Sequence, residues 1–138
     1  MKAKEIQIGD YVNYRGQIIK VTSLYDKGGS NEVGWSDKES VWVNADNVEP
    51  IPLTSEILEK NEFVANKHVY PYPYYEYINK EDEVKVGFAF PQGNRTSYKD
   101  PWVYVDSENV FIEHLPCIFV NQLQHALRLC GIEKEIEL

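Results

Sequence analysis

Short apolar runs separated by turn residues fill the first part of the chain, from residue 5 to residue 50. The runs cover residues 11–14, 17–24, 33–35 and 41–43. Glycine adopts positive φ at little steric cost, so Arg15-Gly16 fits a tight hairpin turn, whereas residues 26–31 indicate a longer loop. Four or five strands this short make no open sandwich of useful depth, but bent strands closing on themselves bury one small core. The pattern therefore predicts a small SH3-like β-barrel over residues 1–52.

A stiff connector, Pro50-Ile51-Pro52, follows this region, because proline restricts both its own backbone and that of the residue before it. Thr54 is the predicted N-cap of a short helix over residues 55–61. Leu53 and Leu58 are spaced to form a hydrophobic staple across the first turn of this helix.

The clearest helical pattern lies near the end of the sequence, where apolar residues recur on one helical face. They are Phe119, Val120, Leu123, Ala126, Leu127 and Cys130. Gly131 then suits the position after the helix, and Ile132 is placed to contact Leu127 as in a Schellman motif. The charged residues 133–138 are expected to form either a loose tail or a short added strand.

Between these helices, alternating and β-branched residues predict three or four antiparallel strands, including residues 83–90 and a hairpin over residues 102–113. The residues 70–77 are unusual because Tyr and Pro alternate. In an extended chain Tyr70, Tyr72 and Tyr74 share one face, and the two prolines remove hydrogen-bond donors from one edge. This segment is therefore predicted to be an edge strand or the approach to one. Residues 53–138 are expected to form an α+β unit in which an antiparallel sheet packs with the C-terminal helix, which makes the whole chain a β-rich α+β protein.

The charge of the chain argues against binding to phosphate backbones. The net charge is −8, and no cluster of Lys and Arg provides the counterion release on which such binding depends. Nucleic acid and anionic membranes are thus disfavoured as partners. The N-terminal residues have no apolar core of signal-peptide length, and no apolar run reaches the length of a membrane span, so a cytoplasmic location is predicted.

Aromatic residues are the main candidates for a binding site. Tyr14, Trp35 and Trp42 lie on the predicted barrel, where aromatic rings line grooves for proline-rich peptides or cages for methylated ammonium groups. The alternative is that they fill the small core. Tyr72 and Tyr74 similarly offer either a stacking strip for a ligand or an edge packed on its neighbour.

The sequence gives little support to catalysis. Cys117 follows His114 by three residues and precedes the C-terminal helix, where a thiolate is activated if it is exposed. Cys130 is expected to face the core of that helix and His125 to face solvent. The two cysteines form no CxxC pair, and the carboxylates are scattered, so no catalytic residue, metal ligand or cofactor is assigned, and the protein is not expected to be an enzyme.

Four segments together resemble a family of short proteins of unknown function from gut Bacteroidetes and their phages or mobile elements. They are residues 8–12 (IGDYV), 48–54 (VEPIPLT), 56–58 (EIL) and 120–138. The chain departs from the family pattern at Asp10, which replaces Asn, at Asn61-Glu62, which replace a turn ending in Gly, and at Asn121, which replaces His. The resemblance implies no activity, and the missing His removes a ligand or base that many members carry.

Three functions are consistent with these observations. The first is a non-catalytic protein-interaction or structural module that binds a protein partner or forms a homo-oligomer, since an exposed sheet edge accepts another strand. The alternative is a nucleic-acid-associated accessory protein of a phage or mobile element. A third, weaker hypothesis is an enzyme that depends on Cys117.

Overall fold

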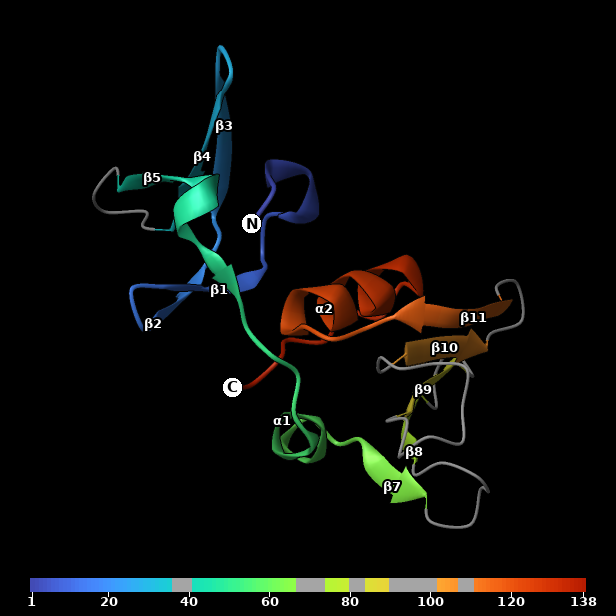
Figure 1. The fold of residues 1–138 in the computed structure, drawn as a ribbon. Coiled ribbons are helices and arrows are strands. Elements are labelled where there is room, and N and C mark those ends of the chain that lie inside the picture. The colour runs from blue at the N-terminus through green and yellow to red at the C-terminus, as the bar shows by residue number, and fades with distance from the viewer. Residues whose placement is uncertain (36–40, 67–73, 80–83, 90–101, 107–110) are drawn as a thin grey trace, which may run out of the picture. The chain divides into compact units, whose positions relative to one another are not determined.

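The computed structural model describes residues 1–35, 41–66, 74–79, 84–89, 102–106 and 111–138 (Figure 1). Two units are distinguished, Met1–Pro52 and Leu53–Leu138. Antiparallel strands make up most of the regular structure of both, and the second also contains two α-helices in its described part. The chain is thus a β-rich α+β protein, as its sequence predicts.

The N-terminal unit contains two three-stranded antiparallel sheets, with strand orders β2-β1-β6 and β3-β4-β5. Its strands are β1 (Tyr11–Tyr14), β2 (Gln17–Lys20), β3 (Ser23–Lys27), β4 (Ser30–Gly34), β5 (Trp42–Asn44) and β6 (Glu49–Pro50). Two 3₁₀ turns, η1 (Ala3–Glu5) and η2 (Ala45–Asn47), precede β1 and β6 respectively.

A bend at Val21 and Thr22 joins the two sheets. The Val21 N–H donates to the carbonyl of Asp10 at 2.8 Å, and the Val21 carbonyl accepts from the Gly9 N–H at 2.7 Å. The next N–H, that of Thr22, donates instead to the carbonyl of Gly34 at 2.8 Å. The chain therefore passes from the β1 side to the β4 side within one residue. The structure thus shows two small antiparallel sheets joined by one bent segment. Closure of these sheets into the barrel that the sequence predicts is not shown.

The sequence predicts a tight turn at Arg15-Gly16 and a longer loop over residues 26–31, and the structure tests both. Arg15 and Gly16 both have positive φ, 50° and 83°, as the tight turn between β1 and β2 requires. The prediction of a longer loop over residues 26–31 is wrong, since β3 and β4 pair as far as Lys27 and Ser30. Gly28 and Gly29, with φ of 55° and 107°, turn the chain alone. Two consecutive glycines reach these angles without strain, so the strands extend to the turn.

The core of the N-terminal unit is small and formed mainly by β-branched residues. It contains Ile6, Val12, Ile19, Val21, Val33, Ala45 and Val48, each at most 6% exposed. Asp10 is also fully buried, and its carboxylate accepts a hydrogen bond from the Gln7 N–H at 2.8 Å. This bond fixes the turn that leads into β1, because it satisfies a backbone donor beside the core.

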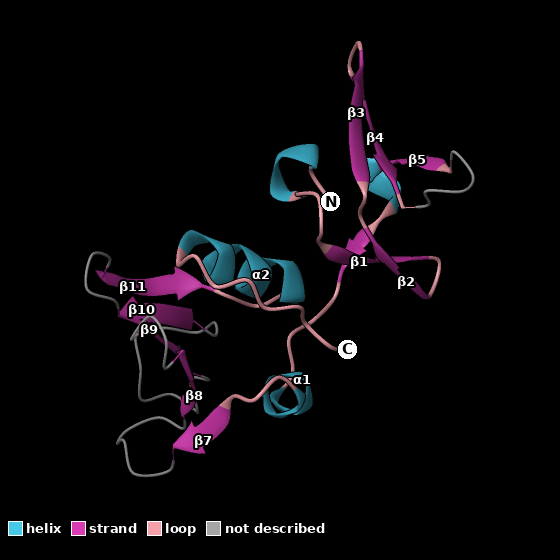
Figure 2. Ribbon diagram, turned by 180° about the vertical axis from the view of Figure 1, so that it is seen from behind, coloured by secondary structure: helices cyan, strands magenta, loops and turns pink. Residues whose placement is uncertain are grey.

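The C-terminal unit has a five-stranded antiparallel sheet in the order β11-β10-β9-β8-β7. Its elements are α1 (Ser55–Lys60), β7 (Val64–Asn66), β8 (Tyr74–Asn79), β9 (Val84–Ala89), β10 (Trp102–Asp106), β11 (Phe111–Pro116) and α2 (Val120–Leu129). Helix α2 contacts β10, and α1 contacts β7 (Figure 2). The sheet packed with the C-terminal helix is thus present, with one strand more than expected.

The predicted edge strand over residues 70–77 is wrong in its described part. Tyr74 pairs with Asn66 of β7 on one side and with Ala89 of β9 on the other, so β8 is an interior strand. On this side the sheet ends in the three-residue strand β7, which the sequence indicates only as apolar residues beyond a helix. Tyr70, Pro71, Tyr72 and Pro73 lie outside the described residues.

The start of α1 and the end of α2 follow the local rules that the sequence indicates. Thr54 Oγ1 accepts from the Ile57 N–H at 3.3 Å, which caps α1. After α2, Gly131 has a φ of 72° and the Ile132 N–H donates to the carbonyl of Leu127 at 2.9 Å, completing the expected Schellman motif. Helix α1 ends in the same way, since the Phe63 N–H donates to the carbonyl of Leu58 at 3.0 Å.

Replacing Thr54 by alanine is expected to lower the free energy of unfolding by about 1 kcal/mol, because the first turn of α1 loses its side-chain acceptor. Thr54→Ser keeps the hydroxyl and is the matched control, with a loss of less than about 0.5 kcal/mol. Urea denaturation followed by circular dichroism measures both. Equal losses in the two variants would contradict a capping role for the hydroxyl.

The last residues are neither a loose tail nor a strand. Residues 133–138 have no regular structure, yet Ile136 is 2% exposed and belongs to the core. The side chain of Asn61, itself 2% exposed, donates to the carbonyl of Glu137 at 2.7 Å and accepts from the Glu137 N–H at 2.8 Å. The tail is therefore held against the end of α1 by the Asn61 side chain. Its amide forms both hydrogen bonds to one residue of the tail, as the backbone of a neighbouring strand would.

Candidate functional site

Tyr14 and Trp35 form one aromatic pair at the margin of the N-terminal core. Their ring centroids are 5.3 Å apart and the rings are tilted by 45°. Both residues are half-buried and pack against the core, and the guanidinium of Arg15 lies 5.2 Å from the centre of the Tyr14 ring. These contacts favour a core-closing role for Tyr14 and Trp35, the alternative to a groove.

Trp42 lies in a second pair, with Tyr25. The two ring centroids are 5.9 Å apart in an edge-to-face arrangement. Trp42 is 39% exposed and Tyr25 is 53% exposed, so both rings offer a large surface to a partner. Among the selected aromatic residues whose side chains the structure describes, namely Tyr14, Trp35 and Trp42, the ring of Trp42 is the most exposed.

The register of β3, β4 and β5 explains why these two rings meet. Ser23, Gly34 and Trp42 form one cross-strand row, and Tyr25, Glu32 and Asn44 form the row two residues further along, which faces the same side. We call the surface formed by Tyr25, Glu32 and Trp42 the aromatic face. Gly34 has no side chain, and a Cβ there would lie 3.3 Å from two ring carbons of Trp42. Glycine thus lets the indole lie against the strand.

Sequence reasoning selects Trp42 but misses Tyr25. The reason is the wrongly predicted loop over residues 26–31. With a loop there, the strand register that places Tyr25 beside Glu32 could not be derived. Two adjacent glycines after an alternating run are the signal that could have revealed it. Of the remaining candidates, Tyr72 lies outside the described residues, and only the backbone of Tyr74, in β8, is described.

The cysteines are poorly suited to nucleophilic chemistry. Cys117 is fully buried, and burial raises the pKa of its thiol to about 12, so at neutral pH it is protonated. Burial also raises the pKa of Cys130, whose Sγ donates to the carbonyl of Ala126 at 2.9 Å. The side chain of His114 and the whole of His68 lie outside the described part.

His125 is expected from the sequence to face solvent, but in the structure it is half-buried. The covered face of α2 is wider than its apolar stripe, because Asn121 and Gln124 are 3% and 6% exposed.

The described residues contain no group of three or more His, Cys, Asp or Glu side chains placed to hold a metal ion. Across the same residues, every helix is too short or too polar to cross a membrane. Comparisons with family models, curated proteins and solved structures give no match to the chain.

Proposed function

We propose that the N-terminal unit is a protein-interaction module of SH3-like barrel topology that binds an extended, proline- and arginine-bearing segment of a partner on the aromatic face. The observation that carries the proposal is the exposed Tyr25–Trp42 pair beside the carboxylate of Glu32. Large aromatic residues at the centre of an interface contribute most of its affinity. An exposed cluster of such residues is therefore typical of a surface that binds a partner.

The barrel topology is supported by the order of the strands. The sheets β2-β1-β6 and β3-β4-β5 share the bent segment from β2 to β3, and a 3₁₀ turn, η2, stands between β5 and β6. A strand that bends from one sheet into another lets five or six short strands enclose one core. The fold itself leaves the ligand open, which is why the proposal rests on the aromatic face.

The chemistry of the aromatic face favours arginine in the partner. A guanidinium stacks on the face of a tryptophan or tyrosine ring and pairs through its planar N–H groups with a carboxylate. Glu32 lies in the cross-strand row of Tyr25, one row from Trp42, so a single guanidinium is within reach of both groups. Proline suits the neighbouring positions because it keeps the segment extended and packs on aromatic rings.

The same features disfavour the nucleic-acid alternative. The aromatic face includes a carboxylate, and the chain as a whole carries a net charge of −8, so a phosphate backbone would be repelled. Stacking platforms for single strands combine their aromatic residues with positive charge. A function that depends on Cys117 receives no support from a buried, protonated thiol.

Replacing Trp42 by alanine is expected to weaken binding of a short proline–arginine peptide by about tenfold, because the stacking surface is lost. Fluorescence anisotropy of a labelled peptide measures the affinity. The same peptide with citrulline in place of arginine keeps the shape and lacks the charge, and it should bind distinctly more weakly. Ile18→Ala changes an exposed apolar residue of β2 outside the aromatic face and serves as the control with unchanged affinity.

Two results would overturn the proposal. Equal binding of the arginine and citrulline peptides would remove the role of Glu32 and of the guanidinium. A dimer in analytical ultracentrifugation that Trp42→Ala dissociates, with no binding of peptide to the wild-type chain, would show that the aromatic face is covered by a second copy instead.

A further inference from the structure

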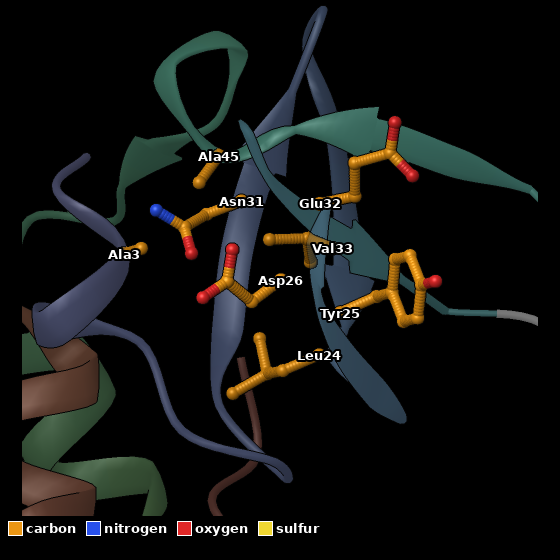
Figure 3. Close-up of a pocket in the computed structure, with 8 residues that line it drawn as sticks. All are labelled: Ala3, Leu24, Tyr25, Asp26, Asn31, Glu32, Val33 and Ala45. Atoms are coloured by element: carbon orange, nitrogen blue, oxygen red, sulfur yellow. The ribbon is translucent and has the colours of Figure 1, made fainter. Parts of the chain in front are cut away.

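A hollow of about 210 Å³ lies on the inner side of the β3–β4 hairpin (Figure 3). Leu24 and Val33 form its apolar floor, and Ala3 and Ala45 border it from the two 3₁₀ turns. Tyr25 and Glu32 also line it, but their side chains point to the other side of the sheet (Figure 3). The hollow and the aromatic face therefore lie on opposite sides of the same hairpin.

The hollow exists because small residues meet a projecting hairpin. Strands β3 and β4 pair as far as Lys27 and Ser30, whereas β5 pairs with β4 only as far as Glu32 and Asn44, so the tip of the hairpin extends beyond its neighbour. Alanines at positions 3 and 45 leave the space beneath it unfilled. Leu24 is consequently 43% exposed although it faces the same side as the core residue Val33.

A polar pair stands at one end of this apolar floor. Asp26 and Asn31 are cross-strand partners, two residues along from Leu24 and Val33, and their side chains point to the same side (Figure 3). The carboxylate of Asp26 and the amide oxygen of Asn31 are both hydrogen-bond acceptors. The hollow thus combines an apolar channel with a negatively charged acceptor end.

The size of the hollow limits its ligand. At about 30 Å³ per water-sized group, it holds about seven such groups, fewer than a nucleotide or a typical cofactor requires. A butylammonium group, the side chain of lysine, fits this volume. Its methylene stem suits the apolar walls, and its ammonium donates to acceptors at the far end.

We propose that this hollow binds a lysine side chain presented by a partner polypeptide. A polypeptide is favoured over a free amine because β3 is one of the two edge strands of its sheet within the described residues. The backbone N–H and C=O groups along that edge are available to an extended chain whose side chain enters the hollow. The proposal does not depend on the aromatic face.

Titration of the full chain with N-acetyl-lysine methylamide, followed by NMR at constant ionic strength, tests this proposal. Saturating shifts are expected for the methyl groups of Leu24, Val33 and Ala45, with a dissociation constant on the order of millimolar. Asp26→Asn should weaken binding by about threefold to fivefold. Glu49→Gln, which removes an exposed carboxylate of β6 that does not line the hollow, should leave it unchanged.

One variant that fills the hollow and two further probes complete the test. Ala3→Leu should abolish the shifts while the remaining spectrum keeps its dispersion, since the larger side chain occupies the space. N-acetyl-norleucine methylamide has the same chain without the ammonium, and binding as tight as that of the lysine probe would overturn recognition of the charge. Equal affinity for butylammonium chloride would overturn the polypeptide partner in favour of a free amine. Persistence of all shifts in Ala3→Leu would overturn the location.

Discussion

Replacing Asn61, a buried polar residue, by leucine is expected to lower the free energy of unfolding by about 3 kcal/mol, more than the loss expected for Thr54→Ala. The side chain of Asn61 donates to the carbonyls of Ile57 and Glu137, both at 2.7 Å, and accepts from the Glu137 N–H at 2.8 Å. Leucine has the same branched skeleton, although it is larger, and it forms none of these bonds. The N–H and C=O of Glu137 would then lose their partners beside a buried side chain.

The loss should be local as well as global. Asn61 holds the backbone of Glu137, and the preceding residue, Ile136, is buried in the core. The variant is therefore expected to release both residues together. Urea denaturation gives the change in stability, and hydrogen exchange of the Glu137 amide reports whether the tail is released. Exchange at this amide is expected to quicken by more than exchange at the centre of α2, which changes only by the global loss of stability.

Lys60→Met is the matched control, because Lys60 also joins α1 to the tail. Its Nζ donates to the carbonyl of Leu138 at 2.7 Å, but this contact is exposed. An exposed bond contributes little, so a loss of less than about 0.5 kcal/mol is expected. If the Asn61 and Lys60 variants lose the same stability, the buried bonds of Asn61 do not hold the tail.

The parts of this fold that the sequence predicts best are those set by near neighbours. The cap at Thr54 and the helix end at Gly131 each depend on residues within five positions along the chain. The tight turn at Arg15-Gly16 depends on two. Local rules of this kind need no knowledge of which strands pair, which is why they are confirmed.

The features that the sequence does not predict depend on distant partners. Asn61 and Glu137 are 76 positions apart, and an asparagine after a helix gives no sign that it pairs with a tail. The exposed pair of Tyr25 and Trp42 follows from the register of three strands, which one wrong loop is enough to hide. The candidate site was therefore half predictable, since Trp42 carries its own signal and Tyr25 does not.

Glu62 shows how an unfavourable backbone conformation is accommodated. It has a φ of 67°, a conformation that favours glycine. Its carboxylate pairs with Lys134 of the tail at 2.5 Å, and this hydrogen bond lowers the pKa of Glu62. The ammonium of Lys134 also lies 5.0 Å from the centre of the Tyr77 ring. A contact with the tail thus accompanies the unfavourable backbone, and only the structure reveals it.

Replacing Gly34 by alanine is expected to lower the free energy of unfolding by about 2 kcal/mol, because the added methyl group overpacks the sheet. The new Cβ would lie 2.5 Å from Ser23 Oγ and 3.3 Å from two ring carbons of Trp42. Urea denaturation measures the loss. Binding of the proline–arginine peptide should weaken in the same variant, since the indole is displaced from the strand.

A second substitution separates the two contacts. Ser23→Ala alone is expected to change stability by less than about 0.5 kcal/mol, because the serine is half-buried at the surface of the sheet. In the Ser23→Ala background the closest contact is gone, so Gly34→Ala should then cost less than about 1 kcal/mol. An equal loss in both backgrounds would assign the clash to the indole. No loss in either would mean that Trp42 does not lie against Gly34, and the aromatic face would lose the contact that holds its largest ring.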